Sequence, residues 1–105
     1  MQIEYDQQRG IVVRPAGLFD YSAGYECVAK TEAYLRDYGA VPITIDFRQT
    51  TFMDSPGIGA LIALMRKLPP QAPLIRLIHP SKSVHKLMEV CHLHRLFEIE
   101  VEAEN

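Results

Sequence analysis

The 105-residue sequence predicts a single compact α/β domain with a mixed sheet of four to five strands, an antiparallel hairpin at one edge and helices packed mainly on one face. Segments of period-two hydrophobicity alternate along the chain with segments of helical period. The helical segments are about a dozen residues or longer, as crossovers between parallel strands require. Ile43, Ile45 and Phe47 share one face of a strand while Thr44 and Asp46 share the other. We therefore expect this strand to be covered mainly on one side.

The hairpin is predicted at the N-terminus. Residues 3–6 alternate apolar and acidic side chains, residues 8–10 form a turn with a glycine, and residues 11–13 are a β-branched run. Two such runs joined by a short turn are typical of an antiparallel pair. Gly17 and Asp20 then mark a connection.

The middle of the chain contains two helices around the third strand. Apolar side chains recur at helical spacing over residues 22–38, and Gly39 follows as a C-terminal stop. The strand spans about residues 41–47. The second helix runs from residue 56 to about residue 68, where two consecutive prolines prevent its continuation.

The last third of the chain repeats this alternation. Residues 74–78 predict a fourth strand, and Ser81 or Ser83 caps a third helix. The apolar stripe of that helix consists of Val84, Leu87, Met88 and Cys91. Residues 98–102 alternate acidic and apolar side chains, which indicates a short edge strand or an extended tail.

Composition narrows the possible functions. With 48% hydrophobic and 23% charged residues, the chain resembles a soluble globular domain and not a disordered one. A net charge of −2 provides no basic surface for nucleic acid. No apolar run reaches membrane-spanning length, and the N-terminus lacks the pattern of a signal peptide. We expect a cytoplasmic protein without membrane insertion, in which Cys27 and Cys91 are buried thiols.

The most informative segment joins the third strand to the second helix. Ser55 lies where the strand pattern ends and the helical pattern begins, so we expect it to be the N-cap of the helix. Pro56 would then occupy the first helical position, where the missing N–H costs nothing. The free N–H groups and the positive dipole end of the helix suit a negative charge, including a phosphate on Ser55 itself.

The residues around Ser55 do not match the sequence patterns of a serine hydrolase or of a phosphate-binding loop. A serine hydrolase elbow needs glycine two residues before the nucleophile, and Met53 stands there. A phosphate-binding loop needs a lysine after its last glycine, and Ala60 follows Gly59. We expect no catalytic residues.

No metal or cofactor site is expected either. Asp46 and Asp54 have no further ligand nearby in the pattern. In the run Cys91-His92-Leu93-His94, residues two apart on a helix point to different faces, and Cys91 belongs to the apolar stripe. A packed thiol beside surface histidines is the better interpretation.

The same segment resembles the signature of STAS domains, the family of bacterial anti-sigma-factor antagonists. The resemblance begins at Ile45-Asp46-Phe47 and continues through Thr51-Phe52-Met53-Asp54-Ser55-x-Gly57-Ile58-Gly59-Ala60-Leu61. Residues 17–20 resemble the turn before the family's first helix, and residues 79–99 resemble its last helix and closing segment. The resemblance thus identifies residues 1–105 as one STAS-like domain.

This resemblance implies a binding protein switched by phosphorylation. The unphosphorylated domain would capture an anti-sigma factor, itself a serine kinase of the histidine-kinase-like ATPase type, and so release a sigma factor. That partner would phosphorylate Ser55, and a PP2C-type phosphatase, which depends on metal ions, would reverse the reaction. The residues that would shape the partner-binding surface are Asp20, Asp54, Gly57, Ile58 and Gly59.

The choice of phosphoacceptor and the function of the domain both leave alternatives open. Pro56 stands where the family often has a second small hydroxyl residue, and Thr50 and Thr51 are other nearby hydroxyls. The chain could also be the accessory subunit of a lipid-transport ATPase, or a ligand-sensing or scaffold domain within a signalling assembly.

Overall fold

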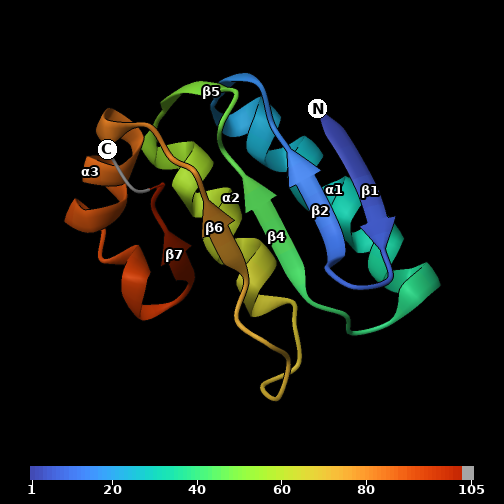
Figure 1. Ribbon diagram of the computed structural model, residues 1–105. Coiled ribbons are helices and arrows are strands. Elements are labelled where there is room, and N and C mark those ends of the chain that lie inside the picture. Colours follow the sequence, from blue (N-terminus) through green and yellow to red (C-terminus); the bar gives the residue numbers. More distant parts are fainter. Residues whose placement is uncertain (103–105) are drawn as a thin grey trace.

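A five-stranded mixed sheet forms the centre of the computed structural model, which describes residues 1–102 (Figure 1). The strands lie in the order β1-β2-β4-β6-β7. Only β1 and β2 are antiparallel, and the other neighbours are parallel. Their bounds are Gln2–Asp6 for β1, Gly10–Arg14 for β2, Ile43–Asp46 for β4, Arg76–Ile78 for β6 and Glu98–Glu100 for β7. The predicted mixed sheet with an edge hairpin is confirmed, and residues 98–100 are a strand.

Helices α1 (Tyr21–Tyr38) and α2 (Ser55–Arg66) lie side by side behind the sheet in Figure 1. Helix α3 (Lys82–Val90) lies beside β7, and a 3₁₀ turn, Leu93–Arg95, follows it. The predicted caps at Gly39 and Ser81 are present. The Gly39 N–H bonds the Leu35 carbonyl, and the Ser81 hydroxyl accepts the Val84 N–H at 3.3 Å.

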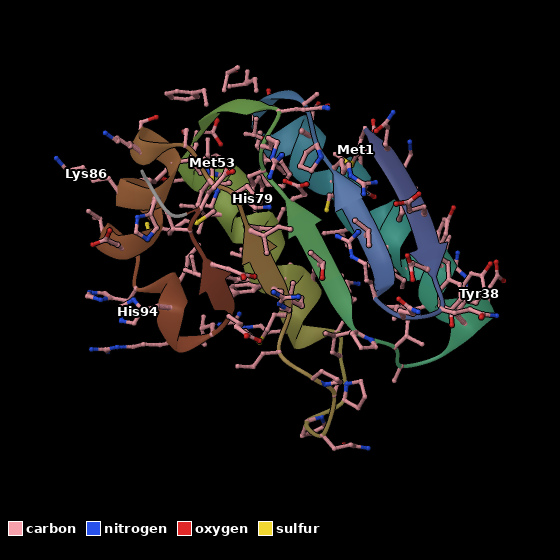
Figure 2. All side chains as sticks on the ribbon, viewed as in Figure 1. Met1, Tyr38, Met53, His79, Lys86 and His94 are labelled. Atoms are coloured by element: carbon pink, nitrogen blue, oxygen red, sulfur yellow. The ribbon has the colours of Figure 1, made fainter. Side chains whose placement is uncertain are left out.

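The core lies between the sheet and these helices. Ile43, Ile45 and Phe47 are at most 2% exposed, as their shared face predicts. The outer end of α1 is fixed to the hairpin by aromatic stacking, since the Tyr5 and Tyr38 rings are parallel with centroids 3.8 Å apart. Figure 2 shows Tyr38 at one end of the molecule, and Lys86 and His94 at the other.

Among residues 1–102, no helix lies over the other face of the sheet, which faces the viewer in Figure 1, yet the centre of that face is buried. Thr44 lies between Val12 and Arg76 in register, and both Val12 and Thr44 are almost fully buried. Asp46 remains partly exposed near Arg14, whose guanidinium pairs with Glu4 at 2.8 Å. The expected one-sided covering therefore holds for the helices, although Thr44 on the open face is also buried.

A second, two-stranded parallel sheet was not predicted. Strand β3 (Gly17–Phe19) pairs with β5 (Thr50–Met53), and the register joins Leu18 to Phe52 and Phe19 to Met53. Each strand leads directly into a helix, β3 into α1 and β5 into α2. The pairing therefore brings the starts of the two helices together at one edge of the domain, at the top of Figure 1.

The two cysteines differ in their surroundings. Cys27 is 1% exposed, and burial raises the pKa of its thiol to about 11. Cys91 is exposed, so the prediction of a buried thiol is wrong there. The predicted apolar stripe of the third helix includes Cys91, but α3 ends at Val90. His92 then adopts a positive φ of 56°, which turns the chain away from the helix.

Candidate functional site

Asp54, and not Ser55, caps helix α2. The Asp54 backbone is extended, and its carboxylate accepts the Gly57 N–H at 2.9 Å. The predicted serine cap is therefore wrong by one residue. Aspartate and serine cap helices about equally well, so propensity alone cannot choose between adjacent candidates.

Ser55 is instead the first residue of the helix, with Pro56 second. Both are exposed, and the Ser55 hydroxyl makes no hydrogen bond to any residue in the range 1–102. The hydroxyl therefore has no capping role and is accessible from solvent. It still lies in the first turn of α2, where the positive end of the helix dipole favours an added anion.

Asp20 holds the equivalent position on the other helix. Its carboxylate accepts the Ala23 N–H at 3.0 Å and caps α1. The Asp54 N–H approaches the Phe19 carbonyl at 3.4 Å, which links the two capping segments. The structure thus brings Asp20 and Asp54 to the same edge, as expected for one site.

The three remaining predicted site residues have different environments. Gly57 packs so closely on β3 that a Cβ there would lie 2.2 Å from the Phe19 carbonyl oxygen. Ile58 is 4% exposed and belongs to the core. Gly59 is exposed, with open space where a Cβ would be. Gly57 and Ile58 therefore set the position of the helix start, whereas Gly59 lies on the surface.

Exposed apolar side chains lie on the strands and the helix near the two helix starts, and the sequence did not predict them. Leu18 and Phe52 are paired across β3 and β5 and are 50% and 57% exposed. Tyr21 and Tyr25, in the first two turns of α1, are also exposed. Apolar residues in a regular pattern are normally expected to be buried. The sequence alone therefore does not show that these four side chains face solvent.

A groove of about 510 Å³ lies between α1 and α2. Tyr21, Tyr25 and Val28 line it from α1, and Pro56 and Ala63 line it from α2. Its lining is mostly apolar. The groove begins at Pro56, the residue that follows Ser55.

The neighbouring threonines are not equivalent to Ser55. Thr50 is 4% exposed, and its hydroxyl donates to the Pro15 carbonyl at 3.0 Å. Thr51 is exposed on β5. Of the two alternative acceptors, only Thr51 presents its side chain to solvent.

Metal ligands do not gather in the part of the chain that the structure describes. Among residues 1–102, no three His, Cys, Asp or Glu side chains are arranged to hold a metal ion. None of the helices described is both long and apolar enough to cross a membrane.

Comparisons with known proteins identify the family and the fold. The sequence model of the STAS domain matches residues 2–104. A protein of Lysinibacillus sphaericus named anti-sigma F factor antagonist is 28% identical over 88 residues, which are 84% of this chain and 75% of that protein. A solved structure of the anti-sigma factor antagonist SpoIIAA in its unphosphorylated form superposes with a TM-score of 0.72 at 25% identity, covering 98% of this chain and 88% of that one.

Proposed function

The chain belongs to the STAS domain family, and we propose that it is an anti-sigma-factor antagonist that binds its partner through the edge around Ser55. The unphosphorylated domain captures an anti-sigma factor and thereby frees a sigma factor. The names of the sequence relative and of the structural neighbour support this function. The observation that carries the proposal is the exposed, unpaired Ser55 hydroxyl in the first turn of α2.

Phosphorylation of Ser55 is the proposed switch. The anti-sigma factor is a serine kinase of the histidine-kinase-like ATPase type, and a PP2C-type phosphatase restores the hydroxyl. The neighbour's description as an unphosphorylated form supports a cycle between two states. Because the Ser55 hydroxyl is exposed and makes no hydrogen bond within residues 1–102, a kinase can reach it without opening the fold.

The physical effect of the phosphate is local. It adds about −1.5 to −2 charges and three strong acceptors. The start of α2 tolerates this charge because of the positive end of its dipole. The surface, however, becomes bulkier and more anionic beside Asp54. A partner that carries its own nucleotide phosphates to Ser55 is repelled by this added charge.

Each predicted site residue has a role in this proposal. Asp54 and Asp20 hold the two helix starts and provide negative charge at the edge. Gly57 and Ile58 fix the depth at which α2 packs on β3 and the core. Gly59 leaves the surface beside Ser55 open to the partner.

The domain itself performs no catalysis in this proposal and acts in the cytoplasm. The Ser55 hydroxyl has no hydrogen-bonded base among residues 1–102, so the group that activates it for phosphate transfer belongs to the kinase.

The test compares three forms of the domain against a kinase-type anti-sigma factor from the same organism. Calorimetry should show tight binding of the wild type and of Ser55→Ala, and binding by Ser55→Asp weakened by about tenfold or more. Radiolabelled ATP should label the wild type but not Ser55→Ala, with Thr51→Ala as the matched control. If Ser55→Asp binds as tightly as the wild type, the switch assignment is wrong, and the transporter-accessory role moves ahead.

A further inference from the structure

We propose that the groove between α1 and α2 is a second part of the partner interface. It receives the apolar face of an amphipathic helix of the same kinase-type anti-sigma factor. This inference rests on the proposed function, because it assigns a further contact to that partner. The proposal adds Tyr21, Tyr25 and Ala63, which line the groove, to the partner-binding surface. None of these residues was predicted from the sequence.

The groove exists because α1 and α2 cross at a close contact. At Gly24, an added Cβ would lie 2.5 Å from the Ala60 Cβ, so the helices approach closely there. On the surface away from the sheet, α2 presents Gly59, Ala60 and Ala63, which are too small to fill the space. The tyrosines of α1 stand beside this strip of small residues, and the result is an open channel of about 510 Å³.

The two tyrosines are held in exposed positions. Tyr21 is 67% exposed and Tyr25 is 66% exposed, and their rings stack with centroids 6.2 Å apart. Exposed aromatic side chains contribute a large apolar area when a partner covers them. They are also the residues that most often dominate the energy of protein interfaces.

The dimensions of the groove fit a helix. Its lining runs from Tyr21 to Glu32 on α1 and from Pro56 to Lys67 on α2. Eleven residues of helix rise about 16 Å, so the groove matches about three turns of a partner helix. At the far end, Lys67 and Glu32 form an ion pair of 3.5 Å, which gives the groove a polar end and leaves its middle apolar.

The position of the groove identifies its occupant. Any kinase that transfers phosphate to Ser55 must cover that residue, and the groove starts at the next residue, Pro56. The exposed Leu18–Phe52 pair lies on β3 and β5, the strands that lead into α1 and α2. A protein that covers the starts of these helices is placed to bury apolar side chains of the groove as well.

The experiment measures binding of the anti-sigma factor to Tyr25→Ala, which removes one wall, and to Ala63→Arg, which obstructs the groove. Val90→Ala and Val90→Arg on α3 are the matched controls, since Val90 is as exposed as Tyr25 and lies outside the groove. We expect both groove variants to weaken binding about 30-fold or more, as loss of an interface anchor does, and both controls to bind as the wild type does. Thermal unfolding of each variant verifies its fold.

A crosslinking measurement identifies the occupant directly. In the background Cys91→Ser, the variant Ala63→Cys carries a photoreactive benzophenone, with Val90→Cys as its control. We expect crosslinks from position 63 to one amphipathic helix of the anti-sigma factor and none to that helix from position 90. Crosslinks elsewhere, or none to the anti-sigma factor, would contradict a helix in the groove.

The outcomes separate this inference from the proposed function. If the wild type binds the partner and Ser55→Asp does not, but the groove variants bind normally, only the groove assignment is wrong. If the wild type itself fails to bind, both fail. Tight binding of a small apolar probe to the groove, without any effect of the groove variants on partner binding, would show a ligand pocket instead.

Discussion

Replacing Gly57 with alanine tests how the start of α2 is placed against β3. The new Cβ would lie 2.2 Å from the Phe19 carbonyl oxygen and 2.9 Å from the Phe19 ring carbon Cδ1. Carbon–oxygen contacts normally begin at about 3.3 Å, so the helix or the strand must move by about 1 Å. Phe19 cannot yield easily, because its side chain is fully buried and its carbonyl accepts the Asp54 N–H.

The magnitude follows from two opposing terms. Overpacking of this kind costs about 1–3 kcal/mol or more, and the better helix propensity of alanine returns up to about 1 kcal/mol. Gly59→Ala is the matched control, because it lies two residues further along α2 with nothing within 4 Å of the added Cβ. That variant should gain about 0.5–1 kcal/mol.

Both variants gain the same helix propensity, so their free energies of unfolding should differ by the overpacking cost, about 1–3 kcal/mol or more, with Gly57→Ala the less stable. For a domain of this size, this corresponds to a difference in Tm of at least about 4 °C. If Gly57→Ala is as stable as Gly59→Ala, the close approach of α2 to β3 does not exist in solution. The contact that holds the start of α2 beside the start of α1 would then be absent.

Three further predictions concern the cap and the cysteines. In urea unfolding, Asp54→Ala should lose about 0.5–2 kcal/mol with the cap, and Ser55→Ala should stay within about 0.5 kcal/mol of the wild type; the reverse order would restore Ser55 as the cap. In the native protein, an aromatic disulfide reagent should modify Cys91 at once and Cys27 only after unfolding, and equal rates for both thiols would contradict the burial of Cys27. Because burial raises the pKa of Cys27 from its ordinary value of 9.0 to about 11, the unfolded chain loses this proton first as pH rises. Stability should therefore fall between about pH 9 and pH 11, by about 2–3 kcal/mol at this site, in the wild type and in Cys91→Ala but not in Cys27→Ala; parallel pH profiles for all three would refute this.

The order of elements could be predicted from the sequence because each long element has its own period and its own stop. Gly39 and Ser81 illustrate this, since each lies at the end of a clear helical pattern and performs the expected cap. The pair β3–β5 could not be predicted, because three or four residues carry too little pattern to distinguish a strand from a connection. Its partners are also about thirty residues apart in the chain.

The location of the proposed site comes from the family resemblance, which stays a prediction for Asp54 and Ser55. The choice of cap could not be predicted, because it depends on which residue is extended and both residue types suit that position. The groove was beyond sequence reasoning for a different reason. It depends on the contact of Gly24 with Ala60, two small residues on different helices that no local pattern connects.

The displacement of the cap from Ser55 to Asp54 changes what the switch must do. A phosphorylated N-cap would lose or alter the hydrogen bond that starts the helix, and stability would then change with the signal. Here the Asp54 carboxylate holds the Gly57 N–H, so the chemical state of Ser55 leaves that bond intact. The same arrangement keeps a fixed negative charge beside the hydroxyl, so in the proposed switch an added phosphate would meet like charge and would change the docking surface strongly. In that proposal, a capping carboxylate next to an exposed hydroxyl separates two functions: Asp54 would maintain the fold in both states, and Ser55 would report the state to the partner.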